Sequence, residues 1–269
     1  MSKWTKKMIA ISLVILLGLS YVLYGYYWSK FHFQIVFKEV QTTKISSSLN
    51  NHTVLFFSDL LYCDENIELV EKAINKIKNY PTDSVVFLGD LYKKDENVSE
   101  ENNQKLIELL SSIKGKYGKY AILGEQDTNE NIVNTYVSSG FEVISNGIVN
   151  VSHNNNDNFQ LVGLNYLNKD NKGIEEVIDP NKFTMLISHA PDIKNYVDST
   201  KYDLIISGHT HANNINFPMF GPLKKIEGNQ QFNQSKGNLT VVNGVSNDKY
   251  TFRYNNRPQI VIYRLVLKK

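Results

Sequence analysis

From residue 53 onward, short apolar runs alternate with segments whose apolar residues recur at helical spacing. Between Glu65 and Asn79 the apolar residues follow one another at three- and four-residue steps, which marks one buried face of a helix. We expect a second helix after Ser99 and a third that starts after Thr128 and ends at Gly140. Strands are expected at 53–57, 84–88, 119–123, 159–164, 183–187, 203–207, 239–243 and 259–266. This alternation predicts βαβ units in one α/β domain rather than an all-β sandwich.

A stretch of 21 uncharged residues, from Met8 to Trp28, precedes this region. A helix of ~20 apolar residues crosses the hydrocarbon core of a membrane, and aromatic residues crowd the far end of this one, as at a lipid–water interface. Three lysines precede the stretch, against Lys30 and Lys38 after it, so we expect a cytoplasmic amino terminus and an extracytoplasmic domain. A cleaved signal peptide is the alternative, but the end of the stretch lacks the small residues that cleavage needs.

These features divide the chain into four parts and make it a single-pass protein of the cell membrane. Residues 1–7 are the cytoplasmic amino terminus, 8–28 the transmembrane anchor, 29–52 a stalk or lead-in strand, and 53–269 the domain. With 42% hydrophobic residues among 269, the chain can bury a sizeable core.

Charge and cysteine content narrow the classes of partner and site. Lysine and arginine number 29 against 27 aspartates and glutamates, without a long block of one sign, so we expect no nucleic-acid partner. The one cysteine, Cys63, rules out an internal disulfide framework and a cysteine-based zinc site.

Acidic or metal-capable residues follow five of the expected strands. They are Ser58-Asp59, Gly89-Asp90, Gly124-Glu125, Ser188-His189 and Gly208-His209-Thr210-His211. Ligands of open α/β sheets bind beyond the carboxyl ends of strands, so these five points should converge. Singly, such aspartates often cap turns and such histidines are ordinary hydrogen-bonded residues; three of six histidines at strand ends argue for a site instead.

Oxygen and imidazole ligands suit one or two divalent ions such as Mn, Fe or Zn. Two ions ~3.5 to 4 Å apart can orient a hydroxide and neutralise the oxygens of a phosphoryl group. Asp90 is the best candidate for a bridging carboxylate, because the glycine before it allows a close approach.

The segments SDLL, GDLY, GEQD, SHAPD and SGHTH, in this order and spacing, resemble the motifs of calcineurin-like metallophosphoesterases, especially their small bacterial membrane-associated or exported branch. The resemblance covers residues ~53 to 266 and implies two packed mixed β-sheets flanked by helices, after one transmembrane helix. It also implies two sets of metal ligands. Asp59, Asp90 and His211 would hold one ion, while Asp90, Glu125, His189 and His209 would hold the other.

The chain departs from the family pattern at three places. Leu61 stands where the first motif has a second ligand histidine, so that ion is one ligand short. In the third motif, Glu125 replaces an asparagine ligand, and Gln126 replaces the histidine that contacts phosphate or protonates the leaving group, next to Asp127. An amide donates a hydrogen bond but does not titrate. Asn213 and Asn214, where the branch often has glycine and glutamine, are the expected substrate contacts.

Two functions remain open on this basis. The first is a metal-dependent phosphoester hydrolase, with Asp90, Gln126 and Asp127 at the reaction centre. Its substrate would be a phosphodiester or a phosphomonoester, either of lipid or cell-envelope origin or soluble outside the cell. The second is a catalytically degenerate relative that binds a metal or a phosphorylated ligand without turnover. The five retained ligands Asp59, Asp90, His189, His209 and His211 favour the hydrolase, whereas Leu61 and Gln126 favour the degenerate relative.

Overall fold

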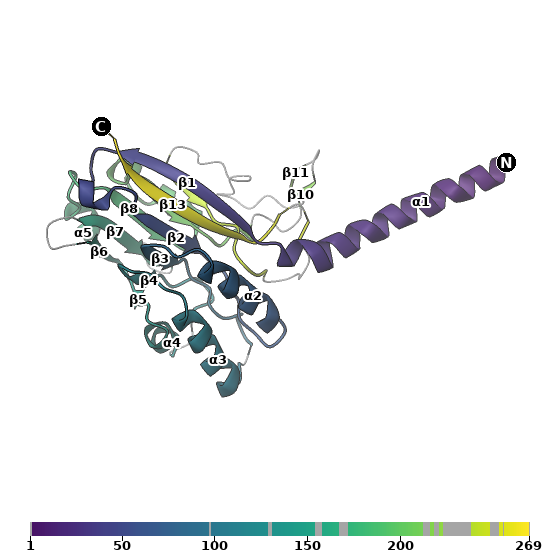
Figure 1. Cartoon of the computed structure of the whole chain (residues 1–269), viewed down its shortest axis with the longest axis horizontal. Coiled ribbons are helices and arrows are strands. Elements are labelled where there is room, and N and C mark those ends of the chain that lie inside the picture. Colours follow the sequence, from purple (N-terminus) through teal and green to yellow (C-terminus); the bar gives the residue numbers. More distant parts are fainter. Residues whose placement is uncertain are drawn as a thin grey trace.

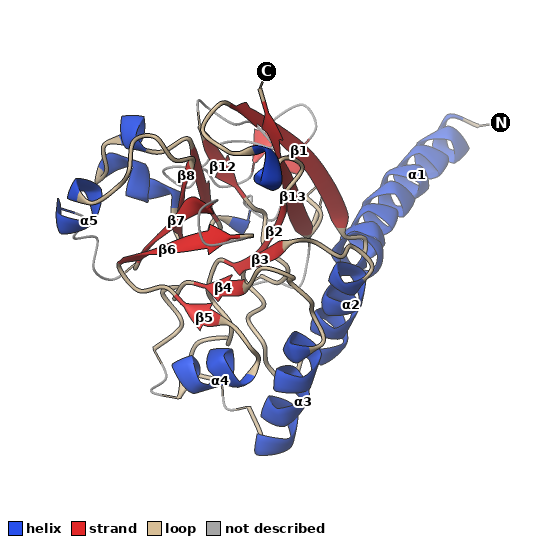
Figure 2. Ribbon diagram, turned by 60° about the vertical axis from the view of Figure 1, so that its left-hand side comes forward, coloured by secondary structure: helices blue, strands red, loops and turns tan. Residues whose placement is uncertain are grey.

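Two mixed β-sheets pack face to face in the domain, with helices on the outside (Figures 1 and 2). The computed structural model describes residues 2–96, 98–128, 131–153, 158–166, 172–211, 216–217, 221–222, 238–247, 253–254 and 256–268. The fold predicted from the sequence, two mixed sheets with flanking helices behind an apolar amino-terminal helix, is confirmed.

The larger sheet has six strands in the order β1-β13-β2-β3-β4-β5. Strands β2 to β5 are parallel, β13 is antiparallel to β2, and β1 is parallel to β13. Its strands are β1 Gln34–Thr42, β2 Thr53–Phe57, β3 Ser84–Phe87, β4 Lys119–Ala121, β5 Glu142–Val143 and β13 Gln259–Leu267. The segment expected as a stalk or lead-in strand therefore contributes β1, an edge strand of the domain.

The smaller sheet has the order β12-β9-β8-β7-β6, in which only β6 is antiparallel to its neighbour. Its strands are β6 Gly147–Ser152, β7 Asn158–Leu164, β8 Thr184–Ser188, β9 Leu204–Ser207 and β12 Leu239–Val241. Two short strands, β10 Asn216–Phe217 and β11 Gly221–Pro222, form a separate antiparallel pair. All eight strands expected from the sequence are present within two residues of their expected bounds; β5, β6, β10 and β11 were not expected.

Alternation along the strands divides the core into layers. In β2, Val54 and Phe56 face the cluster that lies between the two sheets, while Leu55 and Phe57 face the helices on the other side. Those helices are α2 Ile67–Lys78, α3 Glu100–Ser111 and α4 Ile132–Ser138. A third cluster covers the outer face of the smaller sheet beside α5 Lys172–Glu176 and the 3₁₀ turns Pro191–Asn195 and Ser199–Lys201. The carboxyl ends of the parallel strands of both sheets are thereby brought to one edge.

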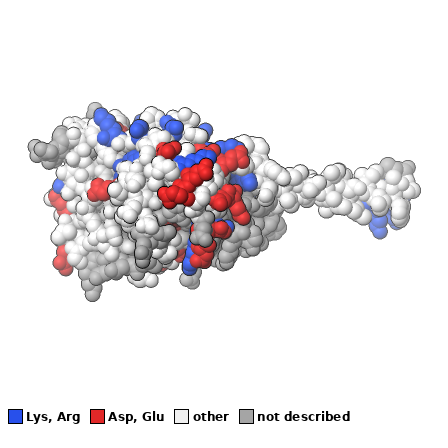
Figure 3. Space-filling view, turned by 90° about the horizontal axis from the view of Figure 1, so that it is seen from below, with Lys and Arg blue, Asp and Glu red and all other residues white. Residues whose placement is uncertain are grey.

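The amino-terminal helix α1, Lys3–Leu23, projects away from the domain (Figure 1). Its side chains are exposed along nearly its whole length, and a π-helical turn, Tyr24–Trp28, and a 3₁₀ turn, Ser29–Phe31, follow it. Together they are long and apolar enough to cross a membrane. In the face shown in Figure 3, acidic and basic side chains are intermingled on the domain, whereas the projecting helix carries basic charge only near its tip.

Candidate metal centre

Five loops meet where β2, β3, β4, β8 and β9 end, and backbone hydrogen bonds join them. The Asp59 amide donates to the Gly89 carbonyl at 3.0 Å, and the Leu61 amide donates to the Asp90 carbonyl at 3.1 Å. From the smaller sheet, the Gly208 amide donates to the His189 carbonyl at 2.8 Å. The structure therefore brings together the five strand ends that the sequence singled out.

Left-handed backbone conformations concentrate in these loops. Among the described residues, eight non-glycine residues have positive φ, and four of them are candidate ligands: Asp59, Asp90, His209 and His211. Leu61, at φ 46°, is a fifth member of the same loops. Such conformations cost free energy and persist where the surrounding contacts fix them, which is common at functional sites.

One glycine permits the closest approach within the centre. A Cβ at Gly124 would lie 2.1 Å from the Asp90 Oδ1 atom and 2.6 Å from the Asp90 amide nitrogen. Any side chain there would push the third loop away from Asp90, so glycine at this position is a steric requirement of the site.

The first half of the centre, which we call the Asp90 half, consists of Asp90, His189 and His209. Candidate ligand atoms of these three residues all lie within 4.8 Å of one another. The Nε2 atom of His189 is 3.2 Å from Asp90 Oδ2, yet neither atom has a hydrogen-bond partner among the described residues. The other ring nitrogen of His189, Nδ1, contacts the Leu88 carbonyl at 2.8 Å, which fixes the orientation of the ring.

Glu125 and Tyr166 border the Asp90 half. A carboxylate oxygen of Glu125 lies 3.5 Å from Nδ1 of His209. The Tyr166 ring stands 5.9 Å from the His189 ring and 5.8 Å from the His209 ring, centroid to centroid. Burial, followed by the Glu125 carboxylate, raises the pKa of Tyr166. Tyr166 was not singled out from the sequence, because a tyrosine two residues beyond a strand has no distinctive pattern.

The second half of the centre, which we call the Asp59 half, consists of Asp59, Leu61 and His211. The Oδ1 atom of Asp59 is 3.7 Å from Nε2 of His211 and has no hydrogen-bond partner among the described residues. Leu61 is fully buried but belongs to none of the three apolar core clusters formed by the described residues. The place of a ligand is thus taken by an apolar side chain outside the main core.

His211 is held by a segment at the carboxyl-terminal side of the centre. Its Nδ1 atom contacts the Ser246 carbonyl at 2.8 Å, and the Asn256 side-chain amide donates to the His211 carbonyl at 2.6 Å. The Ser246 carbonyl also accepts from the Arg253 guanidinium at 2.7 Å. Ser246, Arg253 and Asn256 were missed by sequence reasoning, since they act on the ligand mainly through backbone carbonyls.

The same segment touches the end of the amino-terminal helix. The Arg253 amide donates to the Gly25 carbonyl at 3.2 Å, and the rings of Tyr254 and Tyr21 lie 3.7 Å apart. The Arg257 guanidinium lies 5.3 Å from the centroid of the Trp28 ring. Through Arg253, the helix end and the Asp59 half are therefore connected by direct contacts.

The third loop directs Gln126 and Asp127 differently. The Gln126 amide donates to Asp90 Oδ1 at 2.9 Å, while its side-chain oxygen accepts from the Lys94 amide at 2.8 Å. The Asp127 carboxylate accepts from the amides of Asp90, Leu91 and Gly124 at 2.8 to 2.9 Å and from the Tyr136 hydroxyl at 3.0 Å. These contacts give Asp127 a positioning role, because it ties the Asp90 loop to its own loop; a catalytic role for it stays a prediction.

Burial and charge set the protonation of the Asp90 half. Burial alone would lower the pKa of His189, but the Asp90 carboxylate outweighs it and raises the pKa of His189 to about 10. Burial would raise the pKa of Asp90, and the His189 imidazolium instead lowers it. Burial, and next the charge of His189, lower the pKa of His209. Asp90 and His189 thus form a buried ion pair in the absence of other ligands.

These donors fit a divalent cation. Two buried atoms that face each other without hydrogen-bond alignment, Asp90 Oδ2 and His189 Nε2, together with the His209 ring, offer the oxygen and imidazole ligands that Mn, Fe and Zn accept. The Asp59 half offers one carboxylate and one imidazole and nothing at Leu61. Asn213 and Asn214, the expected substrate contacts, lie outside the described residues.

Comparison with known proteins agrees with this geometry. The pattern of the calcineurin-like phosphoesterase family matches residues 52–213. The chain is 26% identical over 249 residues to the uncharacterised metallophosphoesterase YkuE of Bacillus subtilis, covering 84% of this chain and 85% of that one. It is 25% identical over 227 residues to the phosphodiesterase YaeI of Escherichia coli, covering 79% and 82%.

Among solved structures, TT1561 of Thermus thermophilus aligns with a TM-score of 0.43 and 10% identity, over 59% of this chain and 82% of that one. The family pattern extends over the strand ends that carry Asp59, Asp90, Glu125, His189, His209 and His211. The chain belongs to the calcineurin-like phosphoesterase family.

Proposed function

We propose that the protein is a membrane-anchored, metal-dependent phosphoester hydrolase whose working centre is the Asp90 half. The observation that carries this proposal is the pair of buried, mutually facing ligand atoms, Asp90 Oδ2 and His189 Nε2, with His209 beside them. Burying a carboxylate and an imidazole this deeply is costly for stability alone, and it is expected where a cation completes the site.

In this proposal Asp90, His189 and His209 hold one divalent ion, with the Glu125 carboxylate as a fourth ligand. When bound, the ion supplies positive charge that polarises the phosphoryl group and activates water. The contact with Leu88 aims Nε2 of His189 toward Asp90, and the backbone amide of Gln126 orients the Asp90 carboxylate. The side-chain oxygen of Gln126 already accepts a hydrogen bond from the Lys94 amide. The side-chain nitrogen of Gln126, Nε2, is therefore the group left to donate to a phosphoryl oxygen.

The Asp59 half supports binding of a second ion less well. Asp59 and His211 provide two ligands, whereas the position that would supply another is Leu61. We therefore propose a site with one tightly held ion and a second that is weak or absent. Mn, Fe and Zn are the candidates by ligand chemistry.

The substrate is proposed to lie at the membrane surface. The aromatic end of the anchor helix, Tyr21 to Trp28, contacts the segment that holds His211, so a bilayer around that helix would bring lipid headgroups near the centre. A phosphoester of lipid or cell-envelope origin fits this arrangement. An extracytoplasmic domain is proposed as well, because the charge bias around the helix favours it.

Leu61 and Gln126 favour a second candidate, a relative that binds metal or a phosphorylated ligand without turnover. Neither residue can coordinate or titrate as the family's histidines do. The general-acid contribution that Gln126 lacks is typically worth ~10² to 10⁴ in rate.

The deciding experiment uses the full-length chain in detergent. Bound Mn, Fe and Zn are measured per chain, and hydrolysis of bis(p-nitrophenyl) phosphate is assayed with each ion, for wild type and Asp90→Asn. About one ion per chain, with turnover that Asp90→Asn abolishes, supports the hydrolase. Bound ion without turnover at any tested pH supports the binding protein instead, and absence of bound ion contradicts both.

A further inference from the structure

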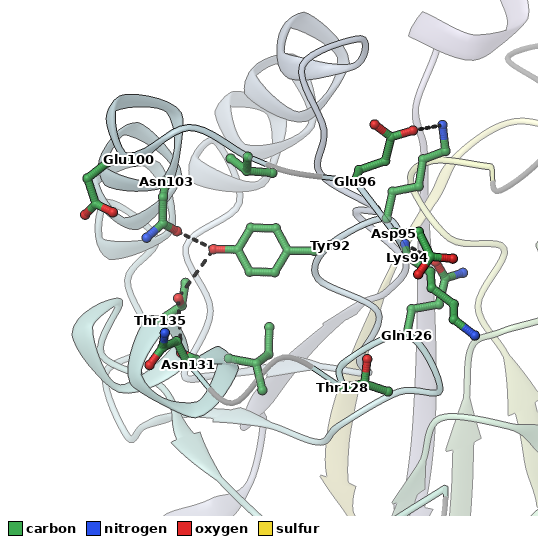
Figure 4. Close-up of a pocket in the computed structure, with 13 residues that line it drawn as sticks. Tyr92, Lys94, Asp95, Glu96, Glu100, Asn103, Gln126, Thr128, Asn131 and Thr135 are labelled. Carbon is green, nitrogen blue, oxygen red and sulfur yellow. Dashed lines mark hydrogen bonds and ion pairs between the residues drawn. The ribbon is translucent and has the colours of Figure 1, made fainter.

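A cavity of about 680 Å³ lies beside the third loop, outside the centre described above. Its walls come from the loop after β3, the start of α3, the loop after β4 and the start of α4 (Figure 4). Its volume falls within the range of ~300 to 1,000 Å³ that is usual for small-molecule sites. No metal-ligand candidate lines it, so its chemistry is separate from that of the centre.

Tyr92 lines this cavity, and its ring is seen face-on near the centre of Figure 4. Its hydroxyl donates to the side-chain oxygen of Asn103 and lies 3.4 Å from the Thr135 hydroxyl, while its ring meets the buried Tyr62 ring edge-on at 6.5 Å. Contacts at both ends hold the ring, and the apolar side chains of Val98 and Ile132 also line the cavity. The cavity thus presents a fixed aromatic face with apolar margins.

Polar groups form the rim. Among the described residues, Asp95, Glu96 and Glu100 contribute three carboxylates, against Lys93 and Lys94. Lys93 forms an ion pair with Glu96 at 3.1 Å. The carboxylates of Asp95 and Glu100 and the ammonium group of Lys94 are not part of this pair. Such a rim accepts hydrogen bonds from hydroxyl groups and disfavours an additional phosphate, because the net charge left over is negative.

Gln126 joins this cavity to the metal centre. It lines the cavity wall, and its backbone amide donates to Asp90 Oδ1 at 2.9 Å. Its side-chain oxygen is fixed by the amide of Lys94, another residue of the wall. A phosphoryl group at Asp90 and an ester substituent in the cavity would therefore be separated by a single residue.

We infer that this cavity is the subsite for a glycosyl substituent of the phosphoester, stacked on Tyr92. The inference rests on the proposed hydrolase. The negative face of an aromatic ring attracts the C–H groups of a sugar, and the carboxylate rim accepts from its hydroxyls. A nucleotide would also stack, but any further phosphate would meet the negative rim. The substrate class is thus a sugar-bearing phosphodiester.

The test compares p-nitrophenyl phosphodiesters of methanol, of methyl glucoside and of thymidine, using the full-length chain. We expect kcat/KM for the glucoside ester to exceed that for the methyl ester by roughly 10-fold to 100-fold. Tyr92→Leu should reduce this ratio at least ~10-fold, whereas Tyr92→Phe, which keeps the ring face, should change it less than ~3-fold. Tyr80→Leu, at a tyrosine outside the cavity, is the matched control and should leave the ratio unchanged.

Binding is measured separately so that a failure of turnover does not hide the result. Saturation-transfer NMR with methyl glucoside 6-phosphate should give a signal with wild type and Tyr92→Phe, and none with Tyr92→Leu. If this pattern is seen without hydrolysis, the subsite stands and the hydrolase proposal fails. Equal kcat/KM for the methyl ester and for both sugar-bearing esters, or an NMR signal that survives Tyr92→Leu, would each overturn the subsite.

Discussion

The two halves of the candidate centre are built in different ways from similar residues. In the Asp90 half the carboxylate of Asp90 and the imidazole of His189 are fully buried and lie 3.2 Å apart, and backbone groups of the domain's own strands and loops fix both side chains, while His209 is partly exposed. In the Asp59 half the corresponding atoms are 3.7 Å apart, and the supports of His211 come from the segment that also contacts the amino-terminal helix.

This difference separates a rigid half from a dependent one. The geometry of the Asp90 half follows from the sheets, which hold it whatever happens to the amino-terminal helix. The Asp59 half depends on Arg253 and Asn256, and Leu61 contributes nothing to ion binding there. One half can therefore keep its affinity for metal while the other half varies with its surroundings.

The largest expected effect tests the rigidity of the Asp90 half. His189→Ala leaves the Asp90 charge buried without its partner, which should cost about 3–5 kcal/mol of unfolding free energy in metal-free protein. His211→Ala removes one hydrogen bond from a partly exposed ring and should cost about 0.5–1.5 kcal/mol. Urea unfolding of both full-length variants with chelator measures the two costs. Equal costs would remove the distinction between the halves.

The next prediction concerns the support of the dependent half. Arg253 is buried, its guanidinium donates to the carbonyls of Asn243, Gly244 and Ser246, and burial lowers its pKa to about 9. Arg253→Met removes the donor to those carbonyls and should lower the unfolding free energy by about 1–3 kcal/mol. It should also weaken the affinity of the Asp59 half for any second ion ~10-fold to 100-fold.

The ion at the Asp90 half should be retained in this variant. Arg264→Met is the control, since Arg264 is an exposed arginine that pairs with Glu39 on the sheet edge. Metal titration by isothermal calorimetry distinguishes the ion bound by the Asp90 half from a second ion bound by the Asp59 half. Loss of both ions together in Arg253→Met would show that the halves are not independent.

Sequence reasoning reached the Asp90 half more completely than the Asp59 half, and the reason is chemical. Asp90, His189 and His209 act through side chains whose types reveal metal binding, and strand ends predict their convergence. Arg253 and Asn256 act on backbone carbonyls, which every residue has, so their residue types carry no such signal. The positive φ of Asp59 and Asp90 is likewise imposed by tertiary contacts rather than by local sequence.

The strands of the fold were also predicted from the sequence with unequal success. Buried strands such as β2 and β8 are continuous apolar runs and were found, whereas β5 has only two residues and β6 is largely half-exposed. The sequence left open whether the segment of β1 is a stalk or a strand, because its pairing partner β13 lies more than 200 residues away. Pairing over that distance leaves no local pattern.

A graded effect, spread over several pH units, follows from protonation of the rigid half. With its pKa raised to about 10, His189 keeps its proton in the metal-free fold, so the pair with Asp90 stabilises the fold fully below pH 6.5. As the pH rises from 6.5 through about 10 this contribution is lost, by roughly 1.4 kcal/mol per unit. Metal must displace the same proton, so its affinity should rise ~tenfold per unit in that range. Calorimetry at pH 7, 8 and 9 checks both slopes, and a flat metal affinity would contradict the ion pair.

The smallest expected effect on metal binding would make the dependent half resemble the rigid one. Leu61→His restores an imidazole where Asp59 and His211 already offer a carboxylate and a ring. Because Leu61 is fully buried, the change places a polar ring in an apolar position and should cost about 1–3 kcal/mol in metal-free protein.

If the missing ligand is what limits the Asp59 half, metal content should rise from about one toward two ions per chain, with the Asp90 half unchanged. Leu61→Gln has a similar volume but is a poor metal ligand, and it serves as the control. Two ions in Leu61→His but one in Leu61→Gln would attribute the asymmetry to a single side chain. One ion in both would mean that the segment around Arg253, rather than Leu61, prevents the Asp59 half from holding metal.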